Sequence, residues 1–315
     1  MSPKKIIAVV GATGAQGGGL VRAILADPSG DWAVRAITRD VTSDKAKALA
    51  ALGAEVVAAD VDNEESLTSA LQGAYGAFFV TFFWDHFSPD KEKQSARNMA
   101  NAAKAAGVHH VIWSSLEDTR KWIPLSDDRM PTLQEHYKVP HFDAKGEANA
   151  YFAEAGVPTT ILNTSFYWEN FIYFGAGPAR GADGVLALTM PMADKKLPGI
   201  AVKDIGKTAF NIFKDPSYIG KTVSIAGEHL TGEEMAKGLS TALGENVVYN
   251  DVPASVYRSF GFPGADDMGN MYQFKAEFNE DFVGARNLNV VRAINPELQS
   301  FSAWLDENKS LIPLG

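Results

Sequence analysis

A glycine-rich segment near the start of the chain has the residue types and spacing of a phosphate-binding turn. An apolar run beginning at residue 6 leads into Gly11, Gly14 and Gly17, and helix-forming residues follow at 20–25. Glycines at this spacing let a strand turn sharply into a helix and let the backbone approach a ligand closely. The N-terminus of that helix presents unpaired N–H groups and a partial positive charge, which suit a phosphate. The segment is therefore a variant of the dinucleotide-binding fingerprint, with a structural turn that binds no ligand as the alternative.

A basic residue follows the second predicted strand. Arg39 stands where NAD-binding folds usually offer an acidic residue to the ribose hydroxyl, and a cation there accommodates the 2′-phosphate of NADP. A guanidinium suits phosphate through its forked donors and its permanent charge. Lys45 and Lys47 add positive charge nearby, whereas the adjacent Asp40 opposes it. We predict NADP in preference to NAD, with a solvated surface arginine as the alternative.

Asp60 and Val61 come directly after the third predicted strand. In a dinucleotide site they would flank the adenine, where the carboxylate would bond to the exocyclic amine or the valine would pack on the ring. The alternative is an ordinary acidic helix cap formed together with residues 62–63.

Thr81, Phe82 and Phe83 end the fourth predicted strand, and Trp84 follows them. At this edge of the sheet their backbone and aromatic surface would line the cofactor. For either phenylalanine alone, packing in the core is the alternative.

Lys145 is the main catalytic candidate. It lies one turn into a predicted helix that begins at Pro140, and His141, four residues earlier, shares its face. Hydride transfer in this architecture needs a proton donor and a cation that holds the ribose and lowers the donor's pKa. Lys145 fits the cation, and His141 occupies the position of the donor; an exposed lysine and a packing histidine are the alternatives. Ser114 and Ser115, which end the fifth predicted strand, fit an orienting or oxyanion-stabilising role.

Other chemistries find little support in the sequence. The histidine spacings match no metal-ligand pattern and the chain has no cysteine, so we expect no metal site. The sequence contains no G-x-S-x-G elbow or nucleophile triad. The carboxylate pairs at 64–65, 233–234 and 266–267 are typical of helix ends or solvated surface and do not indicate a glycosidase.

Strand and helix patterns alternate through the first half of the chain, which predicts an α/β fold with a Rossmann-type doubly wound parallel sheet. The expected strands are 5–10, 32–38, 55–59, 76–81, 110–114 and 159–162, and the expected helices are 16–26, 43–52, 64–71, 91–106 and 140–155. Ligands of such sheets bind at the carboxyl ends of the strands, where the candidate residues above fall.

After residue 164 the clean alternation ends. We expect an NADP-binding Rossmann domain over 1–164 and a smaller C-terminal α/β domain over 165–315, with about 202–214 packing back on the Rossmann domain. The second half is predicted to contain helices at 202–213, 231–243 and 301–308 and strands at 223–226 and 247–252. The helix at 231 carries a capping-box pattern.

Bulk composition narrows the classes of protein. The chain has 315 residues, of which 46% are hydrophobic, enough for one large domain or two coupled ones. The lack of cysteine excludes disulfides and thiol catalysis. A formal net charge of -9 argues against direct nucleic-acid binding. We see neither a secretion signal before the first strand nor an apolar membrane span, and therefore expect a soluble, cytoplasmic protein.

Several of these motifs together resemble the NmrA-like family of atypical short-chain dehydrogenases/reductases. The resemblance runs the whole chain and implies a Rossmann domain and a small C-terminal domain, with NADP(H) in the cleft. Its motifs are Gly-Ala-Thr-Gly-Ala-Gln-Gly-Gly (11–18), Thr-Arg-Asp (38–40), His-Phe-Asp-Ala-Lys-Gly-Glu (141–147), Tyr-Trp-Glu-Asn (167–170) and Gly-Phe-Pro-Gly-Ala-Asp-Asp (261–267).

The resemblance also implies which residues meet each part of NADP(H). They are Gly11, Ala12, Thr13, Gly14, Ala15 and Gln16 for the pyrophosphate; Arg39 for the 2′-phosphate; Asp60 and Val61 for the adenine; Thr81, Phe82 and Phe83 along the dinucleotide; Lys145 for the nicotinamide ribose; and Tyr167, Trp168, Glu169 and Asn170 for the nicotinamide end.

Members of the family divide into redox-sensing regulators and reductases. The Tyr-x-x-x-Lys pair of the superfamily corresponds here to His141 and Lys145. Loss of the tyrosine favours a regulator that responds to NADP(H) through a protein partner, with mobile loops at 116–136 and 175–198. The alternative is an NADPH-dependent reductase of quinones, enones or similar hydrophobic acceptors, with the proton supplied by water or His141. The sequence makes no prediction of the oligomeric state.

Overall fold

The computed structural model describes residues 3–314, which form two compact units. The first unit contains the chain up to Asp118, residues 141–164 and residues 205–223. The second contains residues 119–140, residues 165–204 and the chain from Ser224 onward. This division differs from a single boundary at residue 164, because residues 119–140 belong to the second unit. The segment that returns to the first unit runs over 205–223, where the sequence predicts 202–214.

Seven strands form the sheet of the first unit: β1 (Lys5–Val10), β2 (Trp32–Thr38), β3 (Glu55–Ala58), β4 (Gly76–Phe79), β5 (His110–Ser115), β6 (Thr159–Asn163) and β11 (Thr222–Ser224). Their order is β11-β6-β5-β4-β1-β2-β3, and the strands from β3 to β6 pair in parallel. β1 lies centrally, with Ile7 beside Val34 on one side and Gly76 on the other. The apolar β4 is buried throughout, as a parallel strand covered on both faces must be.

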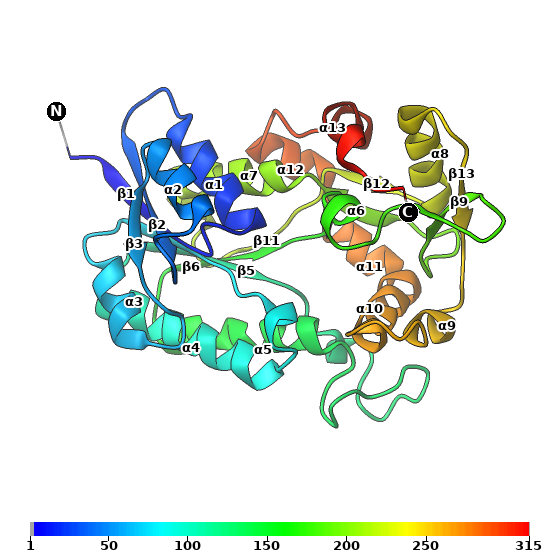
Figure 1. Ribbon diagram of the computed structural model, residues 1–315. Helices are drawn as coiled ribbons and strands as arrows, with labels where there is room; N and C mark the ends of the chain where they lie inside the picture. Colours follow the sequence, from blue (N-terminus) through cyan, green and yellow to red (C-terminus); the bar gives the residue numbers. More distant parts are fainter. Residues whose placement is uncertain (1–2, 315) are drawn as a thin grey trace. The chain divides into compact units, whose positions relative to one another are not determined.

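Helices cover both faces of this sheet, as Figure 1 shows. The helices α1 (Ala15–Leu25), α2 (Asp44–Ala51) and α7 (Val202–Lys214) lie on one face, and α3 (Glu64–Leu71), α4 (Pro89–Ala105) and α5 (Pro140–Glu154) lie on the other. α1 and α7 meet backbone to backbone, since a Cβ on Gly206 would lie 2.3 Å from the carbonyl carbon of Gly19. On the opposite face Phe152 packs against Phe79 and Trp113, with ring centroids 6.2 and 5.3 Å apart.

Polar side chains mark where several of these helices begin. Ser43, Asn63 and Ser88 each accept a hydrogen bond from a backbone N–H in the first turn of α2, α3 and α4. Such caps satisfy N–H groups that have no partner inside the helix. Ser88 and Pro89 place the start of α4 two residues before the predicted Lys91.

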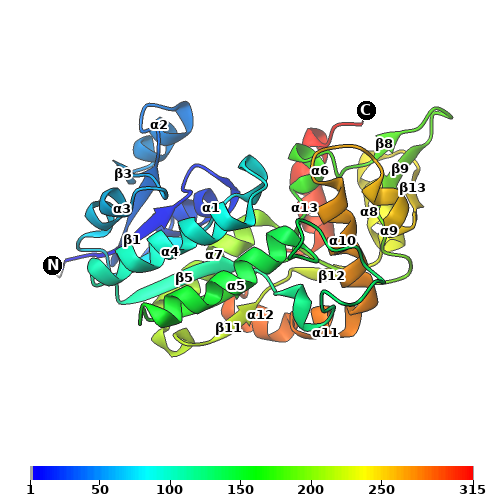
Figure 2. The same ribbon diagram turned by 90° about the horizontal axis from the view of Figure 1, so that it is seen from below.

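The second unit contains two small sheets and a set of helices. One sheet has the order β12 (Glu228–Leu230), β10 (Leu197–Ile200), β7 (Phe166–Tyr167), and the other β13 (Val247–Asn250), β9 (Leu186–Thr189), β8 (Ala179–Arg180). Helix α8 (Gly232–Leu243) lies beside the second of these sheets (Figure 2). It begins with the predicted capping box of Thr231 and Glu234, and ends at Gly244, whose φ of 69° suits glycine.

Segment 119–140 folds with the second unit because α10 (Ala265–Glu277) holds it by hydrogen bonds. The Asn270 amide nitrogen donates to the carbonyl oxygens of Pro131, at 2.9 Å, and Lys138, at 2.6 Å. The remaining helical elements are α6 (Asn170–Tyr173), α9 (Ala254–Arg258), α11 (Asn279–Gly284), α12 (Leu288–Ile294), α13 (Phe301–Asn308) and the short 3₁₀ turns η1 (Phe83–Asp85), η2 (Thr119–Lys121), η3 (Pro216–Tyr218) and η4 (Lys309–Leu311).

The predicted fold class is confirmed, and most elements of the first unit agree within two residues. Three strand predictions run two residues too far: β4 ends at Phe79 rather than Thr81, β11 at Ser224 rather than residue 226, and β13 at Asn250 rather than residue 252. The short strands β7 to β10 and β12, and the helices α6 and α9 to α12, were not predicted. No helix within residues 3–314 is long and apolar enough to cross a membrane.

Candidate functional site

The glycine segment forms a tight turn between β1 and α1. Gly11 has a φ of 70°, which residues with a side chain rarely adopt, and its carbonyl accepts a hydrogen bond from the Gly14 N–H at 2.9 Å. A Cβ on Gly17 would lie only 2.3 Å from the Gly11 carbonyl oxygen. These two glycines are therefore required by the turn itself. The N-cap of α1 is Gly14, which has no side chain that could take up the N–H groups of the first turn.

Gln16 and the two predicted serines take part in hydrogen bonds inside the first unit. The Ser114 hydroxyl donates to the buried Gln16 side chain at 2.8 Å, so it ties β5 to the start of α1. The Ser115 hydroxyl donates to the Asn149 side chain at 2.7 Å and lies 3.2 Å from the Lys145 carbonyl oxygen. Both serines thus brace the elements that carry the candidate residues.

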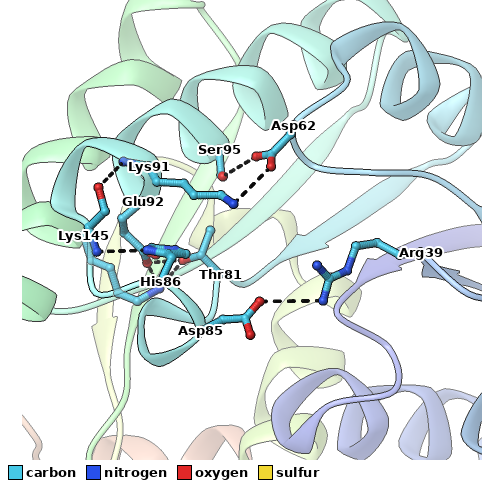
Figure 3. A network of polar contacts seen from close by, with 10 residues as sticks. Arg39, Asp62, Thr81, Asp85, His86, Lys91, Glu92, Ser95 and Lys145 are labelled. Carbon is cyan, nitrogen blue, oxygen red and sulfur yellow. Dashed lines mark hydrogen bonds and ion pairs between the residues drawn. The ribbon is translucent and has the colours of Figure 1, made fainter. Parts of the chain in front are cut away.

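Arg39 projects from the end of β2 toward solvent. Its side chain is 73% exposed, and its guanidinium lies 3.8 Å from the Asp85 carboxylate (Figure 3). The neighbouring Asp40 does not compete for a ligand at Arg39, because its carboxylate accepts bonds from the Thr42 N–H at 2.8 Å and the Thr42 hydroxyl at 2.6 Å. These two bonds lower the pKa of Asp40. The Arg39 guanidinium is therefore exposed to solvent, while the neighbouring Asp40 carboxylate is hydrogen-bonded within its own turn.

Asp60 and Val61 lie in a turn just before α3. The Asp60 carboxylate accepts a bond from the Asp62 N–H at 3.0 Å, and the Asn63 side chain caps α3 by accepting a bond from the Ser66 N–H at 2.9 Å. The Val61 carbonyl accepts a bond from the Asn98 amide at 2.9 Å, and Asn98 in turn accepts one from Gln94 at 2.8 Å. The turn is thus fixed by both α3 and α4.

The centre of the site is a cluster around Lys145, drawn in Figure 3. The Lys145 ammonium lies 2.8 Å from Oε1 of Glu92, a carboxylate of α4 with no exposed surface. The Thr81 hydroxyl joins the pair, because it accepts a bond from the ammonium and donates one to the same carboxylate oxygen. The ammonium also lies 4.9 Å from the centre of the Trp113 ring. A buried cation is thus compensated by charge, by hydrogen bonds and by an aromatic face.

Glu92 is ionised in this setting. Burial alone would raise its pKa, but the charge of Lys145, the neighbouring His86 ring and the hydrogen bonds with Lys145 and Thr81 outweigh burial and lower the pKa to about 2. Its second oxygen, Oε2, lies 3.6 Å from Nε2 of His86. The other ring nitrogen of His86 accepts a bond from the Ser88 N–H at 3.0 Å, so a neutral ring carries its proton on Nε2, facing Glu92.

His141, the predicted proton donor, is packed among aromatic rings. It is buried, with ring centroids 4.7 Å from Trp84 and 6.0 Å from Phe83. Phe83 is also buried, whereas Phe82 is 55% exposed. Phe83 thus packs inside this loop, whereas Phe82 and Phe87, the latter 38% exposed, present aromatic surface.

Tyr167, Trp168, Glu169 and Asn170 belong to the second unit. The Glu169 carboxylate accepts bonds from the Trp304 indole and the Val202 N–H, each at 3.0 Å, and burial raises its pKa despite them. Trp168 is buried beside Trp304, with ring centroids 6.2 Å apart. The positions of these residues within the second unit therefore reflect its own core, and their role toward a cofactor stays a prediction.

Sequence reasoning missed Glu92 and His86. Glu92 stands in the charged run Asp-Lys-Glu-Lys, which is typical of a solvated helix face, and only the fold shows that it points inward. His86 stands close to Trp84 and was considered only as a possible metal ligand. The one indication in the sequence was that Glu92 follows shortly after the fourth predicted strand, whose end carries candidate cofactor residues.

Comparison with known proteins places this geometry in a family. A model described as the NmrA-like family matches residues 3–305. The chain belongs to the NmrA-like family. Among curated members, NmrA-like family domain-containing oxidoreductase FrzB of Cladobotryum sp is 29% identical over 293 residues, covering 85% of this chain and 83% of that protein. The oxidoreductase malD of Malbranchea aurantiaca is 31% identical over 258 residues, covering 78% and 75%.

Solved structures share the NmrA-like fold. NmrA, a negative transcriptional regulator solved in complex with NADP, is 23% identical, covers 97% of this chain and 95% of its own, and has a TM-score of 0.78. Citrobacter sp. triphenylmethane reductase, solved with NADP(H), is 19% identical, covers 96% and 99%, and has a TM-score of 0.75. At these identities the likeness shows the fold, which a regulator and a reductase therefore have in common.

Proposed function

We propose that this NmrA-like protein binds NADP(H) and responds to its redox state. The observation that carries the proposal is the pairing of the glycine turn with Arg39. β1 and β2 are parallel neighbours, with Val10 beside Ile37, so the turn at Gly11 and the cation at Arg39 leave the sheet at the same edge. A helix N-terminus without a capping side chain suits the pyrophosphate, and an exposed guanidinium suits the 2′-phosphate.

The residues present fit this cofactor. In the first unit, residues 11–16 would hold the pyrophosphate, Asp60 and Val61 would border the adenine, and residues 81–83 would lie along the dinucleotide. Lys145 would hold the nicotinamide ribose. The cofactor supplies a hydride when it is reduced, while the chain supplies binding and orientation.

A regulatory role is supported by the environment of the residues at the donor and ribose positions. No tyrosine stands four residues before Lys145, and His141 in that place is buried among rings. The ammonium of Lys145 is held by Glu92 and Thr81. A group that protonates a substrate must be within hydrogen-bond reach of it, and a buried, packed imidazole is poorly suited to this. These observations support a regulator over an enzyme that uses His141 to protonate an acceptor.

A second candidate is an NADPH-dependent reductase of hydrophobic acceptors such as quinones or enones. The names of FrzB and malD, both oxidoreductases of the same family, favour it. Reduction of a quinone or a conjugated double bond can take its proton from water, so it does not depend on the missing tyrosine.

Two measurements on the purified chain separate these roles. Calorimetric titration with NADPH, NADP⁺ and NADH tests binding, and we expect saturable binding with a preference for the two phosphorylated cofactors. NADPH oxidation is then followed at 340 nm, roughly the nicotinamide absorption band, with a panel of quinones, enones and triphenylmethane dyes. Turnover with any acceptor establishes the reductase. Tight NADPH binding without turnover supports the regulator, and no binding of either phosphorylated cofactor refutes both.

A further inference from the structure

We propose that Glu92 is the positioning residue that holds the Lys145 ammonium in place for the cofactor. This inference rests on the proposed binding of NADP(H) and adds a residue that does not itself touch the cofactor. Glu92 lies on α4 and Lys145 on α5, so their contact joins two helices on one face of the sheet (Figure 3).

The geometry explains why Lys145 needs such a partner. Only 8% of Lys145 is exposed, and an ammonium taken out of water loses its proton readily unless an anion compensates it. The Glu92 carboxylate stands at 2.8 Å and is fully buried, so the attraction between the two charges is weakly screened. Burying either charge in this position without the other would destabilise the fold.

Thr81 fixes the orientation of the Lys145–Glu92 pair. Its hydroxyl bridges the ammonium and the carboxylate, which uses a second of the three Lys145 donors and leaves one donor for a further acceptor. Thr81 follows β4 at the cofactor edge of the sheet. The three side chains therefore orient the remaining N–H of Lys145 as a unit.

Other charged groups nearby are engaged elsewhere. On α4, Lys91 pairs with Asp62 at 3.4 Å, and Lys93 pairs with Glu147 of α5 at 3.2 Å. Asp90 lies 3.4 Å from Lys93 as well. Further titratable groups nearby are His86 in the loop before α4, which faces Glu92, and His141 and Asp143 in the first turn of α5. Glu92 is thus the carboxylate matched to Lys145, while Glu147 serves Lys93 at the surface.

The test is the affinity for NADPH, measured by calorimetry at neutral pH. We expect Glu92→Gln to bind NADPH about tenfold more weakly than the wild type, the scale of one hydrogen bond to a charged group. Glu92→Asp, which keeps the carboxylate, should restore part of the affinity. Glu147→Gln removes the carboxylate of the neighbouring surface pair between the same two helices and should follow the wild type. A Glu92→Gln affinity equal to that of the wild type overturns the inference.

A second measurement needs no cofactor and covers the case in which Glu92→Gln folds poorly. The melting temperature of Glu92→Gln should lie below that of the wild type, and adding Lys145→Met should recover part of the loss, because the uncompensated ammonium is then gone. Losses that simply add in the double variant overturn the pairing. If the wild type binds no NADPH while the double variant recovers stability, the proposed function fails and the ion pair stands.

Discussion

The buried carboxylate of Glu92 leads us to predict that the free energy of unfolding of the protein falls at acid pH. The pKa of its carboxyl falls from the ordinary 4.5 to about 2 in the folded chain. Since each unit of pKa corresponds to about 1.4 kcal/mol, the ionised form contributes roughly 3 kcal/mol to the free energy of unfolding. The folded-state pKa lies below the unfolded one, so this contribution is complete above about pH 4.5 and is lost as the pH falls toward 2.

The assay compares wild type with Glu92→Gln by urea unfolding at several values between pH 7 and pH 3. At pH 7 the variant should be less stable by roughly 3 kcal/mol, since it places a neutral amide opposite the Lys145 ammonium. As the pH falls from about 4.5 toward 2 the contribution of the ionised carboxylate is lost, so the difference between the two stabilities should already be smaller at pH 3 than at pH 7. Glu147→Gln, at the more exposed pair with Lys93, should show a difference below about 1 kcal/mol at every pH.

A difference between wild type and Glu92→Gln that stays constant from pH 7 to pH 3 would refute this reasoning. Glu92 would then stabilise the fold by its shape and hydrogen bonds, and its charge would be irrelevant. A difference near zero at pH 7 would show that the buried charges cost as much as their attraction returns.

Three further predictions concern other residues of the site. Arg39→Ala should weaken NADPH binding by about 1–3 kcal/mol, the scale of a charge-assisted contact, and leave NADH nearly unchanged in calorimetric titrations; equal losses for both would reject the 2′-phosphate assignment. Gly17→Ala should lower stability by more than about 2 kcal/mol in urea unfolding, because its Cβ would stand 2.3 Å from the Gly11 carbonyl oxygen, and wild-type stability would mean that the turn can open. Thr81→Val should cost about 1–3 kcal/mol of stability by leaving buried polar atoms without their bridge, whereas Thr81→Ser should stay close to wild type; an equal loss in the serine variant would assign the effect to packing.

The fold of the first unit was predictable because local and long-range signals agree there. Ser43 and Asn63 cap the helices that the sequence places after them, and the apolar strands have the length and composition of a buried parallel sheet. The second unit was less predictable, since strands of two to four residues such as β7 and β8 carry no measurable alternation. Their pairing depends on partners far along the chain, as Gly199 beside Phe166 illustrates.

The candidate site divides in the same way. Backbone-determined features such as the glycine turn were readable, because residues with a side chain rarely adopt the φ of Gly11. The partner of Lys145 could not be predicted. Glu92 precedes Lys145 by more than fifty positions, and in the sequence it resembles its charged neighbours; only the packing of α4 shows that it is buried. His141 shows the limit from the other side: its spacing suggests a proton donor, and the rings of Phe83 and Trp84 around it are a feature of tertiary packing alone.

The alternation of the chain between its two units restricts how the protein can be divided. Segments 1–118, 141–164 and 205–223 build one unit, so the polypeptide passes from one unit to the other five times. A fragment ending at residue 164 would lack β11 and would leave β6 as an open edge, the kind of strand that recruits other chains into aggregates. It would also lose α7, whose Phe213 covers Gly76 in the sheet. Neither unit is therefore a module that can be expressed, exchanged or fused by a single cut in the gene.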